Sequence, residues 1–304
     1  MLNRRAVMIV VAIVAAASII GAIIAFSFVS EPQLSKRNLV VASYYSDSVI
    51  RYDGSTGELI GKFASGGELD GPNYLVFGSD GNLYVTGYDS DNLVRYDGKT
   101  GEFRDVFVKK GAGEFDFGQQ PLFGPDGHLY VVMGDPDVRR YDGQTGEFID
   151  VFASENLVEP DGMTFGPDGN LYVGDFGQDD VKRFDGRTGE FIDIFIANGT
   201  GGLDAPLGLI FGPDGNLYVA SGLSDQVLRY NGDTGDFIDV FVQSSGEIDN
   251  PAGIVFGPDG NLYVSGFDSD NVVRYDGKTG EFMDVFIEKG SGNLDGAAFL
   301  AFSP

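Results

Sequence analysis

The chain has 304 residues and a formal net charge of −26. It has no cysteine and one histidine, which excludes disulfide bonds, thiolate nucleophiles and cysteine-based metal sites. The acid is concentrated after residue 37, where 45 Asp and Glu stand against 16 Lys and Arg. A surface of this charge repels nucleic acid, so we expect no nucleic-acid partner.

The N-terminal segment predicts a membrane anchor. Residues 6–29 are uncharged and follow Arg4 and Arg5, and as a helix they would extend roughly 36 Å, enough to cross a bilayer. The run ends in Ala-Phe-Ser-Phe-Val, a poor cleavage site, so we favour a retained signal anchor, with secretion after cleavage as the alternative. We predict a transmembrane helix and short linker in residues 1–37, in the cell membrane, and an extracytoplasmic domain in residues 38–304.

One repeat accounts for the chain after residue 37. The unit reads Asn-Leu-Tyr-Val, a turn, Val-x-Arg-Tyr-Asp-Gly-x-Thr-Gly-Glu-Phe-Ile-Asp-Val-Phe, a variable loop and Pro-x-Gly-φ-φ-Phe-Gly-Pro-Asp-Gly, where φ is apolar. It starts six times, at Asn38, Asn82, His128, Asn170, Asn216 and Asn261. Four short apolar runs separated by tight turns predict one four-stranded blade per unit. We therefore predict an all-β, six-bladed β-propeller.

Short motifs in the repeat resemble known propeller families. Residues 171–175 (Leu-Tyr-Val-Gly-Asp) resemble the NHL consensus strand, and residues 83–86 (Leu-Tyr-Val-Thr) resemble the YVTN propellers of archaeal surface proteins. Residues 38–304 as a whole are similar to NHL-repeat, streptogramin-lyase-like and gluconolactonase-like propellers. The NHL strand order implies that the Pro-x-Gly strand is innermost. It also implies that residues 297–302 complete the first blade, in a shared-blade (3+1) closure.

With this strand order, the near-identical hairpin turns lie on one face and the variable loops on the other. Recognition usually belongs to variable loops on a rigid scaffold, so we place the functional surface on the loop face. Aligned inner strands put Asn73, Gln119 and Asp161 at one position near the channel mouth. The other three blades have Leu207, Ala252 and Ala298 there, which predicts a mouth that is polar on one side only.

Two carboxylates suggest a metal site. Counting from the turn at Asp168 predicts that Asp161 and Asp175 oppose each other on neighbouring strands, as in no other blade. Such a pair would bind a cation, share a proton or turn outward into water. Oxygen ligands would select calcium or magnesium. The sequence itself requires no cofactor.

Aromatic residues follow the second strand of four blades: Tyr44, Tyr88, Phe176 and Phe267. They predict either an incomplete ring around the mouth that stacks on a ligand or packing between blades. Two other residues also recur in the repeat. Every unit has an Arg at the same position, for which we expect a structural ion pair or hydrogen bond. Five outer strands have an Asp in the middle, where a charge discourages edge association.

The sequence favours a binding function over catalysis. The resemblance to streptogramin lyases implies a catalytic histidine at the channel mouth. The single histidine of this chain, His128, is instead expected in a hairpin turn. Gluconolactonase-like members imply a channel metal, which Asp161, Asp175, Asn73 and Gln119 suit chemically, but their inner-strand glutamate is absent. We expect a binding or cell-surface interaction scaffold for a protein, glycan or small-molecule ligand. A calcium- or magnesium-dependent lactone hydrolase or lyase-like enzyme is the alternative.

Overall fold

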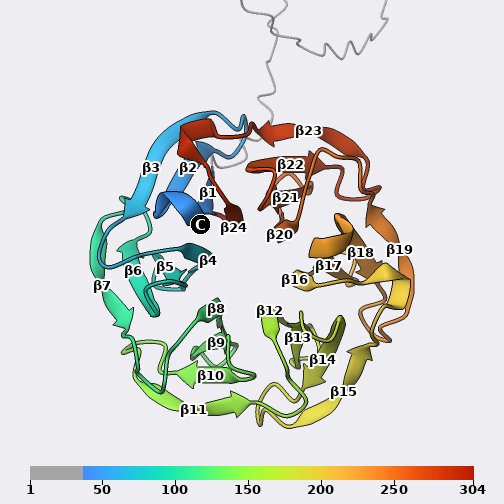
Figure 1. Cartoon of the computed structure of the whole chain (residues 1–304), viewed down its shortest axis with the longest axis horizontal. Helices are drawn as coiled ribbons and strands as arrows, with labels where there is room; N and C mark the ends of the chain where they lie inside the picture. The colour runs from blue at the N-terminus through green and yellow to red at the C-terminus, as the bar shows by residue number, and fades with distance from the viewer. Residues whose placement is uncertain (1–36) are drawn as a thin grey trace, which may run out of the picture. The chain divides into compact units, whose positions relative to one another are not determined.

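The computed structural model describes residues 37–304, which form six four-stranded antiparallel sheets arranged around a central axis (Figure 1). The transmembrane helix predicted in residues 1–37 lies almost wholly outside the described residues. Within residues 37–304, no helix has the length and apolarity to cross a membrane. The all-β, six-bladed architecture predicted from the repeat is confirmed.

Each blade is named here from its innermost to its outermost strand. Blade 1 contains β24 (Ala297–Phe302), β1 (Asn38–Ser43), β2 (Ser48–Asp53) and β3 (Leu59–Ser65). Blade 2 contains β4 (Pro72–Phe77), β5 (Asn82–Gly87), β6 (Asn92–Asp97) and β7 (Phe103–Val108). Blade 3 contains β8 (Gly118–Phe123), β9 (Leu129–Met133), β10 (Val138–Tyr141) and β11 (Phe148–Ala153).

The second half of the ring repeats the same order. Blade 4 contains β12 (Pro160–Phe165), β13 (Leu171–Asp175), β14 (Asp180–Phe184) and β15 (Phe191–Ile196). Blade 5 contains β16 (Pro206–Phe211), β17 (Leu217–Ser221), β18 (Gln226–Tyr230) and β19 (Phe237–Val242). Blade 6 contains β20 (Pro251–Phe256), β21 (Leu262–Gly266), β22 (Asn271–Tyr275) and β23 (Phe282–Ile287). Short 3-10 turns occupy η1 (Tyr44–Ser46), η2 (Thr200–Gly202), η3 (Gly222–Ser224) and η4 (Ser291–Asn293).

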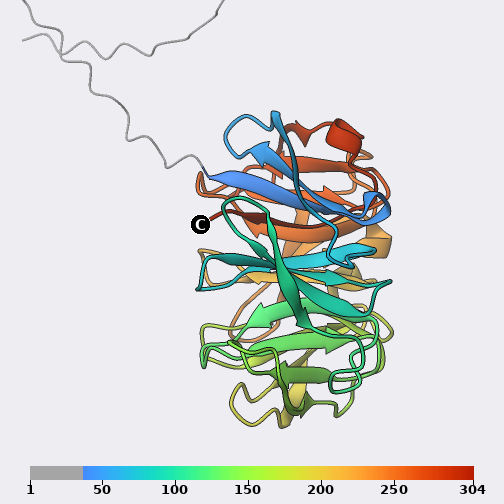
Figure 2. The same ribbon diagram turned by 90° about the vertical axis from the view of Figure 1, so that its left-hand side faces the viewer.

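The last strand closes the ring by joining the first blade. β24 pairs antiparallel with β1, with Leu39 opposite Phe302, and the Ser303 amide donates to the Asn38 carbonyl at 2.8 Å. This is the predicted 3+1 closure. The edge-on view shows the start of β1 and the C-terminus on the same side of the propeller (Figure 2). We call this side the turn face and the opposite side the loop face.

A buried tyrosine joins each pair of neighbouring blades along most of the ring. Tyr218 of β17 packs edge-on against Phe241 in its own blade, at a ring-centroid distance of 4.9 Å, and against Phe256 of the next blade, at 5.1 Å. The same trio recurs around Tyr84, Tyr130, Tyr172 and Tyr263. The Asn-Leu-Tyr-Val motif therefore supplies both a strand and the apolar contact between blades.

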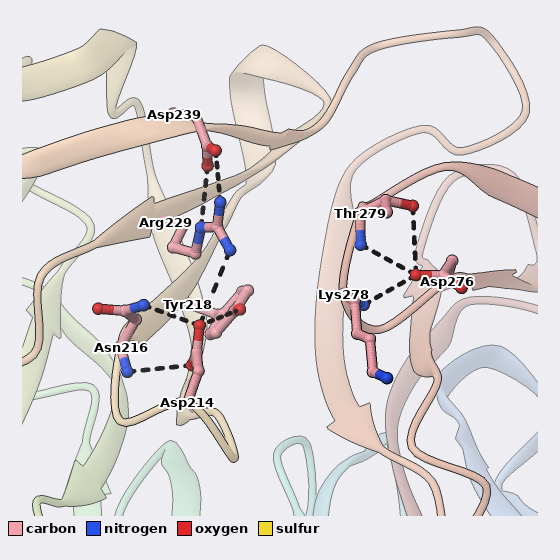
Figure 3. A network of polar contacts seen from close by, with 8 residues as sticks. All are labelled: Asp214, Asn216, Tyr218, Arg229, Asp239, Asp276, Lys278 and Thr279. Carbon is pink, nitrogen blue, oxygen red and sulfur yellow. Dashed lines mark hydrogen bonds and ion pairs between the residues drawn. The ribbon is translucent and has the colours of Figure 1, made fainter.

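The repeated arginine forms the ion pair expected for it. Arg229 donates from Nε and Nη2 to the two carboxylate oxygens of Asp239, at 3.1 and 2.5 Å (Figure 3). Blades 2, 3, 4 and 6 have the same pair. The repeated outer-strand aspartate, interpreted from the sequence as an edge-blocking charge, is thus mainly the partner of this arginine. In blade 1, Gly61 stands opposite Arg51 and the pair is missing.

The hairpin turns follow from Asp and Gly chemistry. Asp214 accepts hydrogen bonds from the Asn216 backbone at 3.1 Å, from the Asn216 side chain at 2.7 Å and from the Tyr218 hydroxyl at 3.0 Å (Figure 3). Gly215 has φ +80°, a conformation that favours glycine. His128 occupies the corresponding position of another such turn, and its amide donates to Asp126. The turn role predicted for His128 is therefore confirmed.

Candidate binding site at the loop face

A cavity of about 350 Å³ opens on the loop face at the end of the central channel. Side chains from all six blades line it. They include every residue proposed from the sequence as ligand-binding, namely Tyr44, Tyr88, Phe176, Phe267, Asn73 and Gln119. The sequence alignment of the blades therefore located the members of one cavity.

The aromatic residues lie where the second strand of a blade ends and its loop begins. Tyr44 lies between the rings of Phe267 in blade 6 and Tyr88 in blade 2, at centroid distances of 5.8 and 6.4 Å. Phe176 is 38% exposed, and Tyr45, which also lines the cavity, is 62% exposed. The rings line the mouth and also pack against one another between neighbouring blades, so both arrangements left open by the sequence are present. Their stacking on a ligand stays a prediction.

Backbone hydrogen bonds hold three of these aromatic residues at the mouth. The amides of Tyr44, Tyr88 and Phe267 donate to the carbonyl oxygens of Gly296, Gly71 and Asn250, at 3.0, 3.0 and 2.9 Å. Gly71, Asn250 and Gly296 each precede an inner strand directly. The geometry of the rings is therefore set by the scaffold rather than by flexible loop tips.

The polar side of the mouth is where the blade alignment placed it. Asn73, Gln119 and Asp161 occupy the second position of β4, β8 and β12, and the Asn73 amide donates to Gln119 Oε1 at 2.6 Å. The equivalent residues of the other three blades, Leu207, Ala252 and Ala298, line the opposite side. The cavity is thus polar on one side and apolar on the other.

The floor of the cavity was not anticipated from the sequence. It is made by Tyr74 and Phe299, whose rings lie 4.5 Å apart between centroids. Phe299 also lines the cavity at the turn-face end of the channel, so it separates the two ends. The Tyr74 hydroxyl reaches from blade 2 to blade 4 and donates to Asp161 Oδ1.

A break in the repeat could have revealed this floor. Blades 4, 5 and 6 have Gly162, Gly208 and Gly253 at the third position of the inner strand, where blades 1 and 2 have Phe299 and Tyr74. A Cβ on Gly162 would lie 1.8 Å from the Leu207 carbonyl oxygen of the next blade. Glycine there permits close approach of the blades, whereas the two aromatic residues fill the channel.

The expected pairing of Asp161 with Asp175 is wrong. A register shift between Pro160 and Met163 places Pro160, not Asp161, opposite Asp175. The same shift occurs in the inner strands of blades 2, 3, 5 and 6. Counting residues symmetrically about the turn missed it because an extra residue in one strand moves every later partner.

Asp175 is fully buried and has its own partners. Its Oδ2 lies 2.7 Å from Lys182 Nζ, and its two oxygens accept hydrogen bonds from the amides of Val158 and Glu159, at 2.8 and 3.0 Å. Lys182 also contacts Asp180 at 2.7 Å. The carboxylate expected to help hold calcium or magnesium is instead neutralised by lysine. Among residues 37–304, no group of three or more His, Cys, Asp or Glu is placed to hold a metal ion.

Asp161 has a different environment. Burial raises the pKa of its carboxyl to about 6, although the hydrogen bond from Tyr74 acts in the opposite direction. Burial and the nearby Asp161 charge raise the pKa of Tyr74 well above its usual value, so this hydroxyl remains a donor. Within residues 37–304, no Lys or Arg forms an ion pair with Asp161. Among the residues that the structure describes, it is the only formally charged side chain that lines the cavity.

Comparison with solved structures identifies the fold. No protein-family model and no curated protein sequence matches the chain. A chain of a nidogen/laminin complex is similar with a TM-score of 0.71 and 17% identity, over 88% of this chain and 98% of that one. A protein of unknown function from Bacteroides caccae gives 0.66 and 14%, over 88% and 99%. Virginiamycin B lyase from Staphylococcus aureus gives 0.52 and 16%, over 67% and 66%. At these identities the likeness supports a six-bladed β-propeller and assigns neither the NHL nor the gluconolactonase family.

Proposed function

We propose that this chain is a binding protein whose ligand occupies the loop-face cavity. One observation carries the proposal: all six blades contribute side chains to a single cavity that combines aromatic rings with a few convergent polar groups. A volume of about 350 Å³ lies in the range of small-molecule sites. A small organic ligand therefore fits the cavity better than a protein partner with a flat surface would.

We also propose that the propeller is displayed outside the cell membrane. The support is the uncharged run of residues 6–29 behind Arg4 and Arg5. Arg37 lines the cavity at the turn-face end of the channel.

The lactone hydrolase remains a second candidate with less support. Asp161 has a pKa near the range suited to a general base, yet the carboxylate expected to hold a metal with it is paired to Lys182. Incubating the full chain with a lactone panel, with and without calcium, tests this alternative. Turnover that Asp161→Asn abolishes would establish it in place of simple binding.

Filling the cavity tests the binding proposal. Ala252, which is half-buried, lines the apolar side of the cavity, so Ala252→Trp should block it without disturbing the core. The matched control is Thr164→Trp, since Thr164 lines the turn-face end of the channel. A small-molecule library, including sugars, is screened by thermal shift on the purified full chain. We expect ligands that raise the Tm of the wild type and the control but not of Ala252→Trp. A library without any such ligand would overturn the proposal.

A further inference from the structure

We propose that the ligand of the loop-face cavity is an organic cation, a substituted ammonium group that pairs with Asp161 and packs its alkyl groups against the aromatic rings. This inference rests on the proposed binding function and adds the chemical class of the ligand. It depends on three features: an unpaired carboxylate, an aromatic lining and an acidic rim.

The carboxylate of Asp161 lacks a counter-ion. Its Oδ1 accepts the Tyr74 hydroxyl, while its Oδ2 accepts no hydrogen bond from any residue in 37–304. A neutral ligand that displaced water from this group would leave a desolvated charge without compensation, which is costly. A cation that displaces the same water supplies the missing partner. The polar side of the cavity therefore discriminates by charge.

The remaining wall is rich in π-systems. Seven aromatic side chains line the cavity: Tyr44, Tyr45, Tyr74, Tyr88, Phe176, Phe267 and Phe299. The face of an aromatic ring carries partial negative charge and attracts cations, most strongly where water is excluded. Alkylated ammonium groups use this surface well, because they have both a charge and an apolar exterior. An anion would be repelled by the rings and by Asp161 together.

The rim around the aromatic residues is acidic. Burial and the neighbouring Asp47 and Asp89 raise the pKa of Asp70, and Asp89 itself accepts the Tyr44 hydroxyl at 2.9 Å. In blade 6, on the other side of Tyr44, Asp268 accepts a hydrogen bond from the side-chain amide of Asn250 at 3.1 Å. Clustered like charges of this kind concentrate cations near the opening and raise their association rate.

A metal ion fits the cavity less well than an organic cation does. Calcium takes six to eight oxygen ligands, usually with several carboxylates, at about 2.3–2.6 Å. Among residues 37–304, Asp161 is the single carboxylate in the lining. The amides of Asn73, Gln119 and Asn250 also line the cavity, but Gln119 Oε1 already accepts the Asn73 amide, so too few free oxygens are left to complete such a site. The same rings supply contact area for methyl or ethyl groups around a nitrogen.

The test compares a cation with its neutral isostere. Choline and 3,3-dimethylbutan-1-ol have nearly the same shape and differ in charge, and tetramethylammonium serves as the minimal probe. Calorimetric titration of the full chain should show choline binding at least tenfold tighter than the alcohol. Asp161→Asn should remove most of this preference. Phe176→Leu keeps an apolar side chain, so it should weaken choline about fivefold and leave the alcohol nearly unchanged.

The control and the outcomes separate this inference from the function on which it rests. Asp233→Asn removes one negative charge from an exposed turn on the turn face, away from the loop-face cavity, so it should retain the preference for choline over the alcohol. If the alcohol binds as tightly as choline, or Asp161→Asn binds choline as well as the wild type, the cation inference is wrong. In that case the binding function still stands, provided that Ala252→Trp abolishes binding. If neither these probes nor any library compound binds the wild type, both proposals fail. Circular dichroism of each variant confirms that a lost signal reflects the site.

Discussion

Asp161 and Asp175 lie in the same blade and are both acidic residues withdrawn from bulk water, but their surroundings differ in kind. Asp175 is satisfied by Lys182 and two backbone amides within the blade. Asp161 projects into a cavity built by all six blades, and within residues 37–304 one tyrosine hydroxyl is its hydrogen-bond partner. The difference distinguishes a carboxylate that serves the fold from one that is available to a ligand.

The largest effect should come from breaking the structural site. Lys182 is 1% exposed, so Lys182→Met leaves Asp175 and Asp180 without a cation. We expect a loss of about 3–5 kcal/mol in the free energy of unfolding, measured by urea denaturation at pH 7. Lys110→Met is the control, because Lys110 is 72% exposed in its contact with Asp91 and should cost less than about 1 kcal/mol. Equal losses in the two variants would remove the distinction drawn for Asp175.

Asp161→Asn should act in the opposite direction. In the ligand-free protein the ionised carboxylate is held in a cavity that raises its pKa from 3.8 to about 6. Its neutral isostere avoids that desolvation, so we expect the variant to be more stable than the wild type at pH 7 by about 2 kcal/mol. The same denaturation measurement checks this. A destabilised variant would mean that Asp161 belongs to the fold, as Asp175 does.

The pH dependence of that difference has a defined sign. Because the folded pKa of Asp161 lies above its unfolded value, its contribution to stability is complete below pH 3.8 and is lost as the pH rises through about 6. The stability advantage of Asp161→Asn should therefore be absent near pH 3.8 and grow towards pH 7. Subtracting the profiles of the two proteins cancels the other carboxylates. A difference that stays constant with pH would contradict the assignment.

A smaller effect is expected in binding. If an organic cation requires ionised Asp161, the affinity of the protein for that cation should be constant above pH 7. Well below pH 6 the affinity should fall up to tenfold for each pH unit. The titratable groups facing Asp161 are Tyr74 and Tyr88, whose pKa values are raised above the usual 10, so they stay neutral throughout. Titrations of tetramethylammonium at pH 7.5, 6.5 and 5.5 measure this slope. In Asp161→Asn the slope should disappear.

Most of the fold could be predicted from the sequence because it is encoded six times. The Leu-Tyr-Val strand, the Asp-Gly turns and the repeated Arg each solve the same local problem in nearly every blade. The predicted residues of the cavity mouth, though not its floor, could be located as well, since aligned blades place equivalent positions at the same height in a ring. Asn73, Gln119 and the aromatic residues lie at the mouth for that reason.

Two features of the site could not be predicted because they depend on contacts between strands and blades. The register shift after Pro160 separates Asp161 from Asp175, and no residue count reveals an extra residue in one strand. The Tyr74 hydroxyl donates across the channel to Asp161 while the Tyr74 ring packs against Phe299, and both contacts join residues of different blades. Outside the site, the anchoring role of the N-terminal segment stays a prediction.

The central claim is that Asp161 is a carboxylate held for an external cation, and its own titration tests this most directly. Aspartate labelled with ¹³C at the carboxyl carbon reports the pKa by NMR, and Asp161→Asn assigns the resonance. We predict a pKa of about 6 in the free protein, falling when tetramethylammonium saturates the cavity. An ordinary pKa near 4 that does not respond to tetramethylammonium would contradict the account.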